Sequence, residues 1–115
     1  MANDWIYEKA NALVKKYFTR DPLELTQILN IHLEEINNTT VLLGMYQIIQ
    51  RNRFIFLSSN LHPNIRKVVL AHEIGHDQLH RKYAKQNAFH EVSIFRELNH
   101  YEIEANIFAA HLLID

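Results

Sequence analysis

The segment VVLAHEIGHDQLH, from Val68 to His80, holds the residues best suited to chemistry in this chain. Within it, His72-Glu73-Ile74-Gly75-His76 matches the H-E-x-x-H pattern. Residues four apart project from nearly the same face of a helix, so the two imidazoles can hold one zinc ion from one side. Glu73 points about 100° around the helix from His72. This direction suits a base that takes a proton from a metal-bound water better than it suits a ligand.

Apolar residues flank both histidines on the predicted helix. With about 100° per residue, the flanking residues are Ile65, Val68, Val69 and Leu79. Buried imidazoles need polar partners. A shared metal ion is one solution, and hydrogen bonds to backbone carbonyls are another. The pattern alone leaves both open, and a third ligand would decide between them.

A third ligand must come from another segment. His80 lies about 12 Å along the helix axis from His72, too far to share its metal. The longer pattern H-E-x-x-H-x-x-G-x-x-H also fails, because its last Gly and His positions hold Leu79 and Lys82.

A helix predicted from Glu97 to Leu113 supplies a candidate. On its helical wheel, Glu102 and Asn106 lie in the middle of the apolar face, whereas Glu104 and His111 point to the opposite, solvated side. An isolated buried carboxylate costs several kcal/mol or becomes neutral, and a divalent cation removes that cost. Glu102 is therefore the predicted third ligand. Asn106 is predicted to accept a hydrogen bond from the ring of a ligating histidine.

Alternatives to these assignments remain open at the level of sequence. The alternative for Asn106 is an ordinary buried amide, and the alternative for Glu102 is a buried ion pair. The basic partners available for that ion pair are Arg66, Lys67 and Arg96. The rival third ligands are His90 and His100.

The composition narrows the class of protein. With 115 residues, 48% hydrophobic and 22% charged, the chain suits one small domain spanning residues 1–115. There is no cysteine, so a metal must be bound by His, Asp or Glu. A net charge of −1 without clustered Lys and Arg argues against nucleic-acid binding. Neither a signal peptide nor a long apolar span is visible, so we expect a cytoplasmic protein without a membrane segment.

The remaining segments must position the two site helices. Helices are predicted at 4–18 and 22–30, the second with Asp21 as its N-cap and Pro22 at its first position. Three antiparallel strands are predicted at 31–36, 41–49 and 54–57, where Gly44 marks a bulge or a close backbone approach. The motif helix should start within two residues of Pro63. Residues 81–90 are predicted as loop and 91–95 as a short helix or strand. The expected fold class is α+β, with a small antiparallel sheet packed by helices.

Together, HEIGH and the downstream segment YEIEANIFAA, residues 101–110, resemble the ImmA/IrrE family of zinc metallopeptidases. That family belongs to the gluzincins and combines H-E-x-x-H with a glutamate from an E-x-x-A-[ND]-x-F-A helix. Further similar segments are Asp21-Pro22 with Leu25 and Leu29, Leu43-Gly44-Met45-Tyr46, and Val69-Leu70-Ala71. The resemblance covers residues 21–115.

The resemblance implies a compact zincin-like core that binds one Zn²⁺ ion through His72, His76 and Glu102, with Glu73 as the catalytic acid and base. It implies cleavage of a helix-turn-helix repressor made by the same phage or mobile element, an antirepressor activity. The alternative is a zinc-containing protein that binds a repressor or toxin without cutting it. Tyr83 and His100 are the first candidates for contacting the oxyanion or substrate, and the others are His80 and His90.

The chain departs from the family pattern at two points. Family members usually continue past the last helix with residues that would wall the substrate cleft, whereas this sequence reads Leu112-Leu113-Ile114-Asp115. The strand ending at residues 56–59 also lacks an Asn typical of the family. A substrate strand could pair with a sheet edge at 54–57, and it is equally plausible that another element caps this edge.

Overall fold

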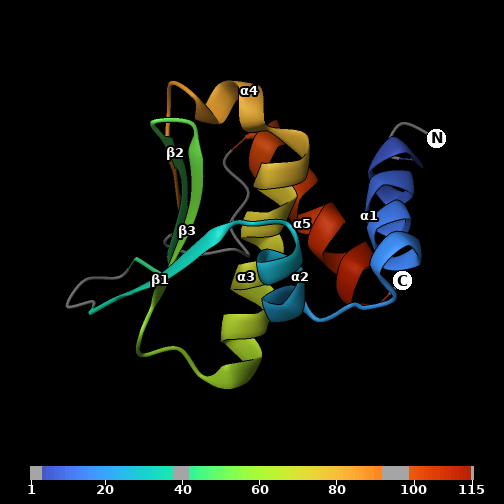
Figure 1. The fold of residues 1–115 in the computed structure, drawn as a ribbon, viewed down its shortest axis with the longest axis horizontal. Helices are drawn as coiled ribbons and strands as arrows, with labels where there is room; N and C mark the ends of the chain where they lie inside the picture. Colours follow the sequence, from blue (N-terminus) through green and yellow to red (C-terminus); the bar gives the residue numbers. More distant parts are fainter. Residues whose placement is uncertain (1–3, 38–41, 92–98, 115) are drawn as a thin grey trace.

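Helix α3 (Pro63–Leu79) lies between the sheet and the other long helices in the computed structural model, which describes residues 4–37, 42–91 and 99–114 (Figure 1). Every residue of α3 from Val69 to Asp77 is buried. The other helices are α1 (Asp4–Tyr17), α2 (Pro22–Ile28), α4 (Arg81–Ala84) and α5 (His100–Leu113). The strands are β1 (His32–Ile36), β2 (Gly44–Ile49), β3 (Asn52–Ser58) and β4 (Phe89–Glu91). The α+β class is confirmed.

The sheet has four strands in the order β1-β3-β2-β4. Strands β2 and β3 form an antiparallel hairpin, and β4 pairs antiparallel with the other edge of β2. Strand β1 runs parallel to β3. The prediction of three antiparallel strands is therefore wrong in number and in the direction of β1. The turn-rich composition after β1 indicates a change of direction, but it cannot indicate that β3 returns between β1 and β2.

Of the two possibilities for residues 54–57, the structure shows the capped edge, because these residues belong to β3, which is paired on both sides. The hairpin turn is shorter than predicted. It uses only Gln50 and Arg51, whose positive φ values of 49° and 70° suit a tight two-residue connection. This turn lets β3 start already at Asn52.

Local signals fixed several helix ends as expected. Asp21 accepts a hydrogen bond from the backbone N–H of Leu23, and Pro22 occupies the first position of α2. Helix α3 begins at Pro63, where the His62 ring accepts from the N–H of Asn64. None of the described helices is long and apolar enough to cross a membrane.

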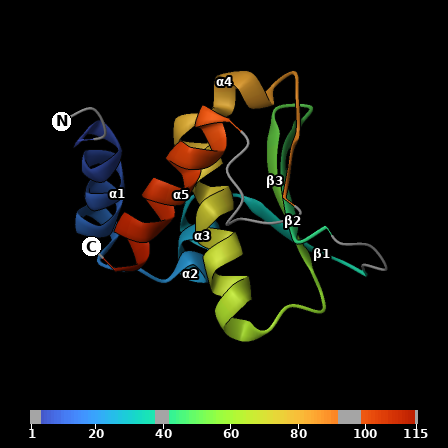
Figure 2. The same ribbon diagram turned by 180° about the vertical axis from the view of Figure 1, so that it is seen from behind.

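Helices α3 and α5 cross very closely, and Figure 2 shows α5 between α3 and α1. A Cβ atom on Gly75 would lie 3.2 Å from the backbone of Ala105 and 3.2 Å from the Phe108 ring. At the start of α5, the Asn99 side chain accepts from the N–H of Glu102 at 3.1 Å. The crossing and this cap together hold Glu102 beside the motif helix. The predicted start at residue 97 lies outside the described residues.

A buried ion pair fixes α3 to the sheet. Asp77 is fully buried and accepts hydrogen bonds from the Tyr46 hydroxyl at 2.6 Å and from Arg53 Nη1 at 2.8 Å. The second terminal nitrogen of Arg53 donates to the backbone carbonyl of Leu29, beyond the end of α2. One guanidinium therefore links β3, α3 and the α2–β1 connection.

Residues 81–91 contain more structure than the predicted loop. Helix α4 and strand β4 form there because Ala84 and Phe89 are buried, although most of their neighbours are polar. The short element predicted at 91–95 is described only at Glu91, the last residue of β4, and the rest lies outside the described residues.

Candidate metal centre

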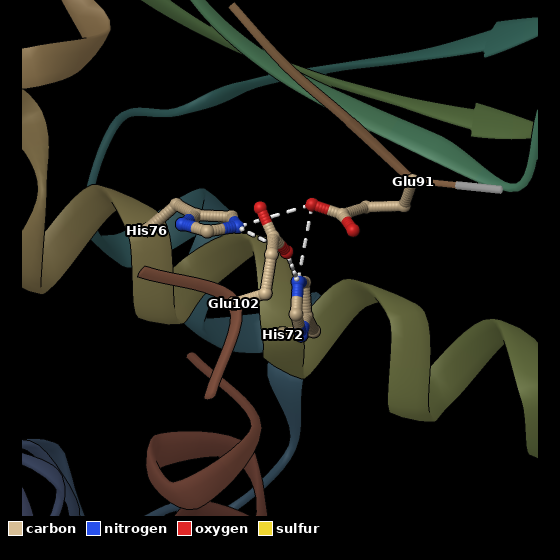
Figure 3. Close-up of side chains that lie close together, drawn as sticks. All are labelled: His72, His76, Glu91 and Glu102. Atoms are coloured by element: carbon tan, nitrogen blue, oxygen red, sulfur yellow. Dashed lines mark hydrogen bonds and ion pairs between the residues drawn. The ribbon is translucent and has the colours of Figure 1, made fainter. Parts of the chain in front are cut away.

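Four side chains from three elements converge beside α3 (Figure 3): His72 and His76 of α3, Glu91 of β4 and Glu102 of α5. Glu102 Oε1 lies 2.9 Å from His72 Nε2 and 3.2 Å from His76 Nε2. Glu91 Oε1 lies 3.1 Å from each of the same two nitrogens. All four candidate ligand atoms lie within 4.8 Å of one another. The structure thus brings together the three predicted ligands and adds Glu91.

The donor set and its spacing suit a zinc ion. Imidazole nitrogens and carboxylate oxygens are ordinary zinc ligands, and tetrahedral zinc separates such atoms by about 3.3–3.5 Å. The four N–O distances of 2.9–3.2 Å are slightly shorter. The two carboxylates would balance the charge of one dication. The four side chains are only 0–12% exposed, so an ion held there would be largely shielded from bulk water.

The electrostatics of the cluster favour a positive charge within it. Burial alone would lower the pKa of His72, but the adjacent Glu102 and Glu91 carboxylates outweigh burial and raise that pKa to about 10. Burial alone would raise the pKa of Glu102, but hydrogen bonds from His72 and His76 hold it well below its usual value. A proton on the rings or a cation among the four ligands satisfies this demand.

Glu73 is completely buried, and within the described part of the chain neither of its carboxylate oxygens has a hydrogen-bond partner. Its pKa is raised, above all by burial, and further by the nearby Glu91 and Glu102, while His72 acts in the opposite direction. A buried polar group without a partner costs free energy unless a donor reaches it. Such a carboxylate is well suited to accept a proton from a water or substrate group.

The place of Glu73 depends on Gly44. A Cβ atom at residue 44 would come within 2.9 Å of Glu73 Oε2 and 2.8 Å of Val69 Cγ1. Of the two roles that the sequence allows for Gly44, the structure shows the close backbone approach.

The outer ring nitrogens of both histidines also have partners. Asn106 Oδ1 lies 2.7 Å from His72 Nδ1. His76 Nδ1 lies 3.0 Å from His80 Nδ1, and His80 Nε2 lies 2.7 Å from Glu104 Oε1. If His76 donates to His80 and His80 donates to Glu104, the Nε2 atom of His76 is left with a free lone pair. The chain of contacts is therefore consistent with metal binding through Nε2.

Glu104 is not the solvated surface acid predicted from the helical wheel. Its side chain is 24% exposed and contacts the ring of His80. The helical wheel assumes that α5 buries a single face. His80, just beyond the end of α3, contacts α5 outside that face.

The other candidates lie outside the four-residue cluster. His90 is exposed on β4, and His100 is exposed at the start of α5 with its ring 4.0 Å from that of Tyr101. Tyr83 is 39% exposed and borders a surface pocket of about 350 Å³ with His80 and Tyr101. Of the basic partners considered for Glu102, Arg66 pairs with Glu35 instead, Lys67 is exposed, and Arg96 lies outside the described residues.

Glu91 was missed from the sequence. The structure buries Phe89 and Glu91 and exposes His90, but the sequence offers one apolar residue followed by two polar ones, which is no apolar alternation. Three residues are too few to distinguish a strand from a polar loop by periodicity.

Comparison with known proteins places the chain in a family. A family model described as the IrrE N-terminal-like domain, a peptidase family, matches residues 26–115. The "uncharacterized immunity region protein 2" of Bacillus phage phi105 is 39% identical over 102 residues, which make up 89% of this chain. The chain spans 63% of the length of that relative. The resemblance inferred from the two motifs is thus confirmed, and the chain belongs to the IrrE N-terminal-like family of peptidases.

Proposed function

We propose that this chain is a zinc-dependent endopeptidase that cleaves a helix-turn-helix repressor of a phage or mobile element. One observation carries the proposal: His72, His76 and Glu102 converge, and Glu73, which interacts with His72 and Glu102, is a buried carboxylate without a hydrogen-bond partner among the described residues. A site that only binds a metal ion needs no such buried carboxylate beside its ligands. A hydrolase does, because water must lose a proton as it attacks the scissile carbonyl.

The side chains have distinct roles in this proposal. Zinc bound by His72, His76 and Glu102 would polarise the scissile carbonyl and lower the pKa of water. Glu73 accepts the proton of the attacking water and delivers it to the leaving amine. The raised pKa of Glu73 helps the second step, because its protonated form persists at a higher pH.

The neighbours of the histidines hold their rings for this task. Asn106 fixes the orientation of His72 through Nδ1, and His80 with Glu104 fixes that of His76. Tyr83 and His100 stay candidates for substrate contact. Both lie next to Tyr101, whose ring is 4.6 Å from that of Tyr83 and 4.0 Å from that of His100.

The choice of substrate rests on the setting of the relative. The phage protein is named for an immunity region, which supports a phage or mobile-element setting for this chain. We infer a repressor of the same element as the target and, because repressors act on DNA inside the cell, a cytoplasmic enzyme.

The test is to incubate the zinc-loaded protein with the repressor encoded beside its gene and to analyse the products by mass spectrometry. Wild type should cut the repressor at a defined bond. Glu73→Ala should retain zinc, counted by metal analysis, and lose cleavage. Glu8→Ala, which removes an exposed glutamate of α1, is the control and should cut like wild type. Undiminished cleavage by Glu73→Ala would eliminate the proposed mechanism.

A second candidate function is a non-proteolytic protein that uses zinc as a structural clip and binds a repressor or toxin. Glu91 favours it, because four protein ligands are typical of structural zinc. The unpartnered Glu73 favours the peptidase. Stable binding of the intact repressor by zinc-loaded protein, without cleavage, would support the clip.

A further inference from the structure

We propose that β4 is a built-in inhibitory strand, which fills the water position of the metal centre with Glu91 and covers the sheet edge that a substrate strand needs. The inference rests on the proposed peptidase function and deepens it. It makes the described conformation a latent form of the enzyme, which becomes active when β4 is displaced.

The first support is that Glu91 and Glu102 contact the histidines equally well. The Glu91 oxygen is 3.1 Å from both Nε2 atoms, and the Glu102 oxygen is 2.9 and 3.2 Å from them. Catalytic zinc keeps one of four positions for water, whereas four protein ligands close the site. With both glutamates engaged, no position is left for the water that Glu73 would deprotonate.

The second support is the edge that β4 occupies. Strand β4 ends the described strand order on the β2 side of the sheet, and its pairing with β2 sets Glu91 opposite Gly44. A Cβ atom on Gly44 would lie 2.9 Å from Glu73 Oε2, so the residue opposite Gly44 sits where Glu73 can act. An extended peptide that adds to this edge of β2 would present its own backbone there. Strand β4 and such a peptide cannot pair with β2 at the same time.

The third support is the side chain two residues before Glu91. Phe89 is 5% exposed and stacks on the His76 ring, with centroids 3.8 Å apart and planes 8° apart. The rings of Tyr83, Tyr101 and His80 also lie near Phe89, with centroids 5.1, 5.8 and 5.8 Å away. Phe89 thus fills an aromatic pocket next to the metal ligands. A substrate that replaces β4 should place a large apolar side chain in the same pocket.

Displacement of β4 would break few backbone pairs, and its main cost would be release of the buried Phe89 and Glu91 side chains. Within the described residues, three residue pairs join β4 to β2, and a strand of three residues is at the short end of those found in globular proteins. When β4 leaves, His72, His76 and Glu102 remain as three ligands with an open position beside Glu73.

The experiment replaces zinc by Co²⁺, whose visible spectrum reports coordination, and uses azide as a small anionic probe of an open position. The variants are Glu91→Ala and Glu91→Gln, and His90→Ala on the exposed side of β4 is the matched control. Wild type and the control should show a four-coordinate spectrum that azide leaves unchanged. Both Glu91 variants should show an altered spectrum that azide shifts, and their zinc affinity should fall roughly tenfold or more.

Phe89→Ala provides a second route if the Glu91 variants fold poorly. It keeps the Glu91 carboxylate and removes the aromatic anchor, so azide should bind better than in wild type. The inference is overturned if azide shifts the wild-type spectrum as strongly as that of Glu91→Ala. It is also overturned if the spectrum of Glu91→Ala equals that of wild type.

Repressor cleavage at saturating zinc separates this inference from the proposed function. Faster cleavage by Glu91→Ala than by wild type supports both. If Glu91→Ala gains azide binding but no variant cleaves the repressor, the inference that Glu91 closes the metal site stands. The proposal that this site belongs to a peptidase is then rejected. If wild type and Glu91→Ala cleave equally fast and have identical cobalt spectra, the peptidase proposal stands and inhibition by β4 is rejected.

Discussion

Replacing Arg53 by Met would test how the motif helix is fixed to the sheet. The Asp77 carboxylate is fully buried and takes two contacts from Arg53 Nη1, at 2.8 and 3.1 Å. Met retains much of the apolar stem but removes the charge. Among the described residues, Asp77 would then keep two neutral donors, the Tyr46 hydroxyl and the Gln78 amide. We expect a marked loss of stability, because a buried negative charge loses its positive partner.

The size of the loss follows from burial. Removing one partner of a buried ion pair costs about 3–5 kcal/mol. The Arg53 side chain is 21% exposed, and two donors remain at Asp77. We therefore expect the lower end of the range, about 3 kcal/mol. In a chain of 115 residues, this lowers the midpoint of thermal unfolding by roughly 10–15 °C.

The assay is urea unfolding in the presence of a chelator, so that metal binding does not contribute. Arg53→Met, Asp77→Leu and the double variant form a cycle, and the double variant should lose less stability than the sum of the two single losses. Arg66→Met is the control. It breaks the exposed pair with Glu35 and should change the free energy of unfolding by at most about 1 kcal/mol. A coupling energy below about 0.5 kcal/mol between Arg53 and Asp77 would refute the reasoning.

Three other outcomes can be measured on the same protein. Gly44→Ala should reduce stability by about 1–3 kcal/mol and abolish repressor cleavage, because the new methyl group would overlap Val69 and Glu73; normal cleavage with normal unfolding would contradict this. Burial, together with Asp77, raises the pKa of Tyr46 well above that of a free tyrosine. The neutral phenol is thus favoured in the folded state, and its contribution to stability holds at neutral pH and is lost as the pH rises above about 10. Absorbance titration should show equal phenolate in wild type and Tyr46→Phe until the wild type unfolds; extra phenolate in folded wild type would count against it. Zinc at a hundredfold excess over its dissociation constant should stabilise the fold by about 2.7 kcal/mol, and an unfolding midpoint that chelator leaves unchanged would argue against a metal at this cluster.

The two site helices could be predicted from sequence because their signals are local. The spacing of His72 and His76 predicts a shared face, and the position of Glu102 within an apolar face predicts that it needs a partner. Both statements concern neighbours within one helix. The structure then brings the three side chains together.

The parts that could not be predicted depend on contacts between distant segments. Strand β4 is ordered by pairing with β2 and by the stacking of Phe89 on His76, 13 positions earlier in the sequence. Likewise, β1 runs parallel to β3 because β3 returns between β1 and β2. Neither feature has a local sequence signature. The position of Glu91 at the candidate metal site therefore cannot be predicted without the assembled sheet.

The burial of Glu73 has opposite effects on the stability of the fold and on the proposed catalysis. Its two oxygens lie in the packed interior without a donor from the described part of the chain, so exchanging this residue for an apolar one of similar size should make the metal-free fold more stable. Apolar substitutions that arise by chance at this position would therefore raise the thermal stability of the protein. Glu73 should persist only in lineages in which loss of the proposed proteolysis is harmful. Relatives with an apolar residue at this position should be more stable proteins that retain the fold and lack the peptidase activity.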